Sequence, residues 1–155
     1  MVNNMNQELR IKYEKLKERN KIIAIEKSWK DNMLLQECIG IIEGEVLEYE
    51  EGLRITDDIQ IKILFLNGRV DFDEFKYQNN INDISSIETL VDANIDVYIM
   101  WDQFKLPCLK SKLSQIIRHI DDVACVSFDT WIVSVDYNIV IEIYHEGEIT
   151  LGILS

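Results

Sequence analysis

Carboxylates and a histidine gather in the last third of the sequence, where they could bind a divalent metal or exchange protons. Within twenty residues lie Asp129, Asp136, Glu142, His145, Glu146 and Glu148. Because alternate side chains of a strand point to opposite faces, Glu142 would share one face with Tyr144 while His145 points to the other. The pattern therefore favours a solvent-facing sheet surface with carboxylates in its turns. A small metal-dependent enzyme or ligand-binding domain that uses Asp129, Glu142 and His145 is the alternative.

The sequence contains no motif of a common catalytic or metal chemistry, since GxSxG, HExxH, GxGxxG and the P-loop pattern are all missing from it. His119 follows apolar residues near the end of a predicted helix, where a positive charge suits the helix dipole. Cys38, Cys108 and Cys125 are odd in number and form no CxxC pair, which predicts reduced structural thiols. We therefore expect no catalysis and no cofactor.

Charge is divided unevenly along the chain. Residues 1–30 hold eight Lys and Arg against four Glu, a net charge of +4, whereas residues 31–155 hold eight against 24 Asp and Glu, a net charge of −16. A field of negative sign attracts basic proteins and can raise their association rate by roughly 10- to 1,000-fold, while it repels nucleic acid and acidic membranes. The sequence therefore indicates a basic protein partner and excludes nucleic acid and membrane.

Acidic residues are densest in two runs that also contain aromatic side chains, Tyr49 in the first and Phe72 and Phe75 in the second. Carboxylates beside aromatic anchors are typical of an interface with a basic protein, because charge sets the association rate and buried aromatics hold the complex. An ordinary solvated surface with Phe72 and Phe75 in the core is the other interpretation. The candidate partner-binding residues are Glu43, Glu45, Glu48, Glu50, Glu51, Asp57, Asp58, Asp71, Asp73 and Glu74, with Asp129, Glu142 and Glu146 as second choices.

Length and composition indicate one globular domain over residues 1–155, with 47% hydrophobic and 28% charged residues and a single proline. The polar N-terminus resembles no export signal, and no apolar run approaches the ~18 residues of a membrane span. These features predict a cytoplasmic protein. Trp29, Trp101 and Trp131 are spread along the chain, which favours core packing over a stacking platform.

Apolar residues at helical spacing predict a helix from residue 5 that either continues to about Cys38 or breaks near Asn20 into two. A period of two then predicts a strand over residues 59–65 and a return strand over residues 70–75. Asn67-Gly68 between them is the strongest hairpin signal in the chain, because these residues tolerate the positive φ of a type I′ turn.

The second half of the sequence predicts a short helix capped by Asp83 or Ser85 and then a strand over Asp96–Trp101. An amphipathic helix is expected to follow Pro107, over residues 109–121. The remaining predicted strands are residues 123–128, 131–135, 139–145 and 148–154. The fold class is therefore α+β: N-terminal helices, a β-hairpin, then a helix leading into an antiparallel β-meander.

Several segments of the C-terminal third carry a family resemblance: Trp101-Asp102-Gln103, Leu106-Pro107, Asp121-Asp122-Val123, 127–131 and 142–152. They resemble segments of bacterial toxin-immunity proteins, including those paired with contact-dependent growth inhibition toxins. The resemblance implies a cytoplasmic acidic protein that neutralises a cognate toxin, commonly a basic nuclease, by covering its active site or another surface.

The main prediction is thus a non-enzymatic immunity protein whose acidic surface binds a basic toxin domain. Two alternatives remain beside it. One is the small enzyme or ligand-binding domain described above, and the other is a subunit that self-associates through the helix at residues 5–20.

Overall fold

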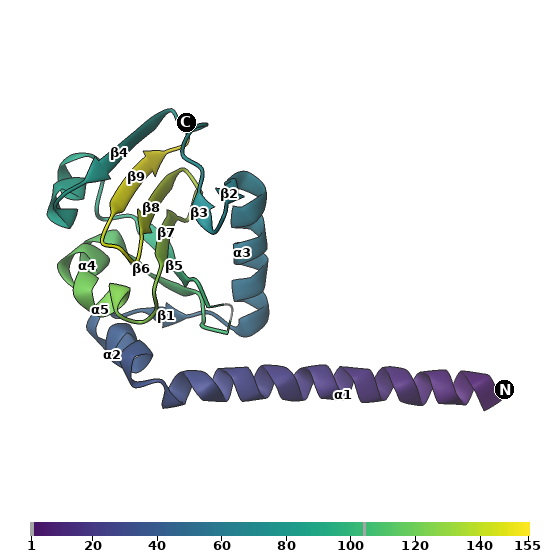
Figure 1. Cartoon of the computed structure of the whole chain (residues 1–155). Helices are drawn as coiled ribbons and strands as arrows, with labels where there is room; N and C mark the ends of the chain where they lie inside the picture. Colours follow the sequence, from purple (N-terminus) through teal and green to yellow (C-terminus); the bar gives the residue numbers. More distant parts are fainter. Residues whose placement is uncertain (1, 104) are drawn as a thin grey trace.

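The computed structural model describes residues 2–103 and 105–155 of the chain. Figure 1 shows a long helix, α1 (Val2–Asp31), that extends away from a body built around one antiparallel sheet. The C-terminal end of α1 is attached to the body through buried Trp29, whose indole Nε1 donates a hydrogen bond to the carbonyl of Lys105 at 2.6 Å. Within residues 2–103 and 105–155, every helix is too short or too polar to span a membrane.

The first helix breaks at Asn32, after which α2 (Met33–Ile41) begins. Asn32 has extended backbone angles, and its side chain accepts a hydrogen bond from the backbone N–H of Leu35 at 3.1 Å. A side-chain oxygen at this position satisfies one of the unpaired N–H groups of the new helix. Both predicted alternatives were therefore wrong, since Asn20 lies inside α1 and the helix does not continue unbroken to Cys38.

The sheet has seven strands in the order β1-β6-β5-β7-β8-β9-β4, and all neighbours are antiparallel. The strands are β1 (Glu45–Val46), β4 (Tyr77–Ile81), β5 (Asp96–Trp101), β6 (Leu109–Lys112), β7 (Thr130–Ser134), β8 (Ile139–Ile143) and β9 (Ile149–Ile153). The last three strands form the predicted meander. The prediction of an α+β fold with N-terminal helices and an antiparallel sheet is confirmed.

Apolar side chains cover both faces of this sheet, because successive residues of β5 alternate between them: Ile99 packs on one face and Met100 on the other. The first face is covered by α2, η1 (Ile84–Thr89), α4 (Leu113–Arg118) and α5 (Ile120–Ala124). The second face is covered by α3 (Tyr49–Lys62) and by the hairpin of β2 (Phe65–Leu66) and β3 (Arg69–Val70). Figure 1 shows α3 along one side of the sheet and α4 and α5 on the other.

The predicted strand over residues 59–65 is wrong, since α3 continues to Lys62. Isoleucines at 59, 61 and 63 fit a strand, but Ile55, Ile59 and Ile63 also fit one helical face. That face is the buried one, whereas Ile61 is 82% exposed. Packing of a whole helix on the sheet therefore overrode the local alternation.

The hairpin turn is confirmed, with φ values of 54° at Asn67 and 78° at Gly68. Its return strand stops at Val70, however, and Phe72 and Phe75 are buried in the segment that follows. The core interpretation of these two phenylalanines is thus correct. Asp83 caps η1 as predicted, through a hydrogen bond from the backbone N–H of Ser85.

The helix predicted after Pro107 begins later than expected, at Leu113, because residues 109–112 pair with β5 as β6. Leu109 and Ser111 face the core while Lys110 and Lys112 lie further out. The predicted strand over residues 123–128 is also wrong. Val123 belongs to α5, and its buried side chain joins the core beneath the sheet.

Candidate functional site

The densest group of candidate acidic side chains lies on α3. Glu48 precedes the helix, Glu50 and Glu51 occupy its first turn, and Asp57 lies one to two turns further along. Acidic residues in a first helical turn are favoured, because the helix N-terminus carries partial positive charge. All four side chains are exposed to solvent.

The position of α3 is fixed by its buried face. Gly52 is buried against the sheet, and a Cβ atom at this position would lie 3.3 Å from the Cβ of Cys108. Ile55 and Ile59, which are 2% and 0% exposed, continue this face. The opposite face of α3, with its carboxylates, is therefore held towards solvent as a rigid surface.

The negative charge of α3 is only weakly compensated. Arg54 approaches Glu51 at 4.0 Å, but both side chains are largely exposed and such a pair contributes little. Lys62 lies over the ring of Tyr137, with its ammonium 4.8 Å from the ring centroid. Among the described residues, Glu50 and Asp57 form no ion pair.

The acidic run that follows the hairpin lies at the far end of the same layer. The backbone N–H of Asp71 donates to the carbonyl of Leu64, directly after α3, at 2.8 Å. Asp73 is held in a turn by a 3.1 Å hydrogen bond from its N–H to the Asp71 carboxylate, and Glu74 is exposed beside it. The structure thus places the two runs, which are separate in sequence, in one layer on one face of the sheet. We name this layer the acidic surface; its members are Glu48, Glu50, Glu51, Asp57, Asp58, Asp71, Asp73 and Glu74.

Glu43 and Glu45 lie elsewhere. Glu45 is on the outer strand β1 and pairs with Lys110 of β6. Both glutamates line a shallow groove together with Asp96, Lys110 and Lys112, so basic side chains neighbour them. These two candidates are therefore separated from the acidic surface.

Glu142 is buried rather than solvent-facing, at 1% exposed, which corrects the expectation for this position. One carboxylate oxygen accepts from Nε and Nη2 of Arg69 at 3.1 and 3.0 Å. The other accepts from Nε1 of Trp131 at 3.0 Å and from the backbone N–H of Val70 at 2.7 Å. Burial alone would lower the pKa of Arg69, but its hydrogen bonds and charge interactions with Glu142 and Glu148 raise that pKa above its ordinary value.

Asp129 and His145, two of the three residues grouped in the alternative site, are in contact. One oxygen of Asp129 accepts the backbone N–H of His145 at 2.8 Å and lies 2.9 Å from Nδ1 of its ring. Thr130 of β7 pairs with Ile143 of β8. Asp129 directly precedes Thr130 and His145 lies two residues after Ile143, so both lie at the same end of this antiparallel pair. A correct alignment of the two predicted strands would have indicated the contact.

The three residues of the alternative metal site are thus divided between two arrangements. Both oxygens of Glu142 already accept two hydrogen bonds each, so this carboxylate has no free lone pair directed at a metal. Over residues 2–103 and 105–155, no group of three or more His, Cys, Asp or Glu side chains is placed to hold a metal ion.

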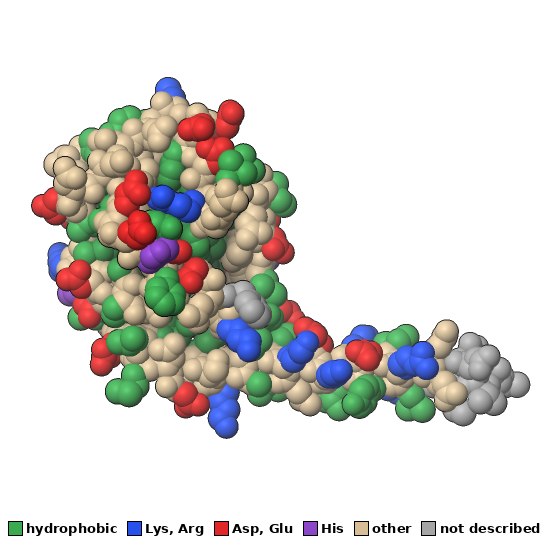
Figure 2. Space-filling model, viewed as in Figure 1, with side chains coloured by type: hydrophobic (Ala, Val, Ile, Leu, Met, Phe, Trp, Pro, Cys, Tyr) green, Lys and Arg blue, Asp and Glu red, His purple; other side chains and the backbone are tan. Residues whose placement is uncertain are grey.

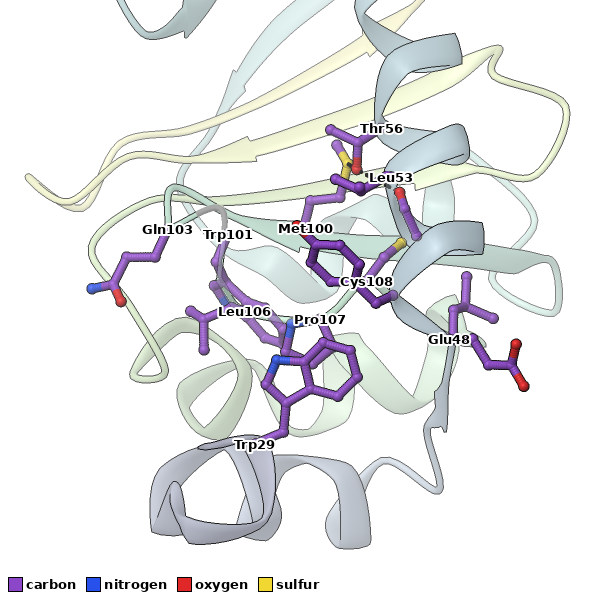
Figure 3. Close-up of a pocket in the computed structure, with 13 residues that line it drawn as sticks. Trp29, Glu48, Leu53, Thr56, Met100, Trp101, Gln103, Leu106, Pro107 and Cys108 are labelled. Atoms are coloured by element: carbon purple, nitrogen blue, oxygen red, sulfur yellow. Dashed lines mark hydrogen bonds between the residues drawn. The ribbon is translucent and has the colours of Figure 1, made fainter. Parts of the chain in front are cut away.

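A cavity of about 90 Å³ lies between α3, the end of α1 and the segment between β5 and β6. Figure 3 shows Trp29 below this cavity, Met100 and Cys108 beside it, and Leu106 and Pro107 along its side. Sites for small molecules usually enclose about 300–1,000 Å³. The cavity is too small for such a ligand and separates packed elements of the core.

The cysteines are all free, and only Cys125 is exposed. Burial raises the pKa of both Cys38 and Cys108 to about 12, and the neighbouring Glu51 adds to this effect at Cys108. Since the thiolate is the nucleophile, neither buried thiol is suited to covalent catalysis.

Residues 32–152 match the family model described as CdiI immunity protein, EcoliA0-like. No curated protein matches the chain. The resemblance predicted for the C-terminal third is confirmed, and the match extends over most of the chain. The matched range contains the acidic surface and the sheet up to Gly152 of β9, while α1 precedes it.

Proposed function

Because this chain belongs to the family of CdiI immunity proteins, we propose that it binds a cognate toxin domain and neutralises it without catalysing a reaction. The proposal goes further than family membership in three respects. The toxin domain is basic, and it contacts the acidic surface on α3 and beyond the β2–β3 hairpin. The complex forms in the cytoplasm, where such a toxin would act.

The observation that carries this proposal is the weakly compensated negative charge of α3. Glu50 and Asp57 are seven residues apart on its exposed face, which separates them by about 10 Å along the helix. The body that carries them, residues 31–155, has a net charge of −16. A field of this sign steers a basic domain towards the body, and the fixed carboxylates then set the orientation of the complex.

The apolar contacts with the toxin domain are made by other residues than the aromatic anchors that the sequence indicated. Phe72 and Phe75 are each 8% exposed and belong to the core, so they are not interface anchors. Leu53, Ile61 and Leu64, which are 41%, 82% and 53% exposed, lie on or directly after α3 and supply apolar contact area among the carboxylates. Apolar contacts surrounded by charge are typical of the centre of a protein interface.

A nuclease domain is the class of toxin that best fits this surface. Its substrate is a polyanion, so its active-site cleft must be basic. A rigid row of carboxylates occupies such a cleft as phosphates would, and bound there it excludes the substrate. Neutralisation then requires only that the protein bind the toxin domain tightly and cover its active-site cleft.

The test is to co-express the full chain with the toxin domain encoded beside it. We expect growth to be rescued, the two proteins to co-purify, and their association rate to fall steeply between 50 and 500 mM NaCl, as screening over about 10 Å predicts. A toxin domain of acidic net charge, or an association rate that salt leaves unchanged, would contradict the electrostatic part. Failure to bind or to rescue growth would contradict the function itself.

A further inference from the structure

The long helix α1 has an apolar stripe that its own body leaves uncovered. Leu9, Tyr13, Leu16 and Ile23 are 63%, 65%, 56% and 54% exposed. Figure 1 shows that α1 extends past α3 and away from the sheet, so only its C-terminal end contacts the body. Isolated helices are marginally stable in water and usually gain stability by burying an apolar face.

Leu9, Tyr13, Leu16 and Ile23 share one side of α1, whereas Ile11, which is 55% exposed, points to the same side as Trp29. At about 100° per residue, the stripe is turned by roughly 120–160° from Trp29, which faces the body. The four glutamates of α1 lie within about 60° of Trp29, on the body-facing side. They are Glu8, Glu14, Glu18 and Glu26. The stripe therefore faces away from the body and away from the helix's own negative charges.

Basic side chains flank the stripe on both sides. Arg10 and Lys17 lie along one edge and Lys12 and Arg19 along the other, each roughly 80–120° from Trp29. Figure 2 shows Lys and Arg side chains following one another along α1, whereas Asp and Glu side chains predominate on the body. Basic and acidic side chains of α1 are thus largely separated around the helix, with two exceptions: Lys15 lies about 40° from Trp29, among the glutamates, and Lys27 lies about 160° from it, beside the stripe.

We propose that the occupant of this face is a second copy of the chain, with α1 of each copy laid on α3 of the other. Two α1 helices cannot pair stripe to stripe, because parallel and antiparallel arrangements both place basic edges against basic edges. An acidic membrane repels the body, whose net charge is −16. The exposed face of α3 is the complementary surface that the chain itself carries.

The two helix faces match in spacing as well as in charge. Glu50 and Asp57 are seven residues apart on α3, as are Lys12 and Arg19 on α1. On α3, the exposed Leu53 lies between Glu50 and Asp57, and the exposed Ile61 lies one turn beyond Asp57. Leu53 and Ile61 are about 12 Å apart along the helix axis. Successive stripe residues Leu16 and Ile23 are about 10 Å apart, so apolar contacts and charge pairs can form together. In this dimer the α1 helix of each copy acts as an arm that binds α3 of the other copy. The arrangement closes with twofold symmetry and covers both the stripe of α1 and the exposed face of α3.

This inference goes beyond neutralisation and has a consequence for it. The second copy covers the same face of α3 that we assign to the toxin, so toxin binding and self-association exclude each other. The toxin-free protein is then a dimer whose arms protect the apolar residues of α3, and the toxin complex contains one copy with a released arm. Self-association can be measured without the toxin, and therefore independently of neutralisation.

The experiment is sedimentation of the full chain over a range of concentrations at 50 mM NaCl. We expect a monomer–dimer equilibrium for the wild-type chain, and about a tenfold or greater rise in the dissociation constant for K12E/R19E and for E50K/D57K. Combining the four changes restores the charge match and should restore the dimer. The matched control is E14K/E18K on the body-facing side of α1, which should leave dimerisation intact. Circular dichroism establishes that each variant is folded.

Three outcomes would overturn the proposal. The first is a wild-type chain that stays monomeric at every concentration. The second is a dimer that the arm changes weaken while E50K/D57K does not, since the arm would then bind another surface. The third is binding of the wild-type chain to vesicles of anionic phospholipid that K12E/R19E abolishes, which would make a membrane surface the occupant. A chain that is monomeric yet still neutralises its toxin would contradict this inference alone.

Discussion

The guanidinium of Arg69 binds the buried carboxylate of Glu142 across 73 residues of sequence, with nitrogen–oxygen distances of 3.0 and 3.1 Å. Arg69 also lies over the ring of Tyr144, at 4.0 Å from the ring centroid. These contacts fix the tip of the β2–β3 hairpin on the sheet, next to the end of α3. A short hairpin of two residues per strand has little stability of its own, so its position depends on this attachment.

Replacing Arg69 with Met should therefore destabilise the protein by about 1–3 kcal/mol, because it leaves a buried carboxylate short of two donors. The partial exposure of Arg69, at 36%, limits the loss. Urea denaturation measures the change. In a double-mutant cycle, Glu142→Gln should cost less in the Arg69→Met background than in the wild-type chain. Additive effects would show that the two residues do not interact energetically.

Gly152 on β9 lies where no other residue fits. A Cβ atom there would lie 2.6 Å from the Phe72 ring and 2.7 Å from the Phe75 ring. We expect Gly152→Ala to lower the free energy of unfolding by about 1–3 kcal/mol through overpacking. Gly40→Ala is the matched control, since the space around Gly40 is open. That substitution lies in α2 and should stabilise the protein by about 0.5–1 kcal/mol, so equal effects at the two positions would contradict the packing argument.

Local patterns predicted the elements whose residues carry their own signal. Asn67 and Gly68 adopt the positive φ values that the hairpin required, and Asp83 caps η1 through its side chain. Strands β7, β8 and β9 follow from alternation between turn residues. In each case the determining contact lies within a few residues, which is why sequence alone was sufficient.

Elements that depend on distant contacts were mispredicted. The helical face of Ile55, Ile59 and Ile63 is selected by the sheet beneath α3, and residues 109–112 are a strand because β5 offers a partner. The burial of Glu142 depends on Arg69 in the same way. Charge density was visible in the sequence, but which carboxylates share one face follows only from the folded layer.

The three thiols should differ sharply in reactivity. Cys125 is exposed, whereas burial raises the pKa of Cys38 and Cys108 to about 12. Since disulfide reagents react with the thiolate, a colourimetric assay at pH 8 should detect one thiol rapidly in the native protein and three after denaturation. Cys125→Ser should remove the rapid phase. A rapid phase that survives this change would mean that a buried thiol is accessible.

Asp136 should contribute to stability in a pH-dependent way. The Ser134 hydroxyl at 2.6 Å and the Asn138 N–H at 3.0 Å hold the pKa of Asp136 below its ordinary value of 3.8. A folded-state pKa below the unfolded value gives stability that is present above about pH 3.8 and is lost as the pH falls through the folded value. The stability difference between the wild-type chain and Asp136→Asn should therefore be constant near neutral pH and shrink in acid. Ser134→Ala should weaken this dependence, and a difference that does not change with pH would contradict the assignment.

Reversing three carboxylates at the start of α3, in the variant E48K/E50K/E51K, should slow association with the toxin domain and flatten its dependence on salt. The physical reason is that long-range attraction acts mainly on encounter, while the dissociation rate depends on short-range packing. Stopped-flow kinetics between 50 and 500 mM NaCl separates the two rates. The matched control E37K/E88K/D121K changes the net charge equally, but its exposed sites lie on α2, η1 and α5, across the sheet from α3. If both variants slow association equally, net charge rather than the acidic surface steers the toxin; if neither does, α3 lies outside the interface.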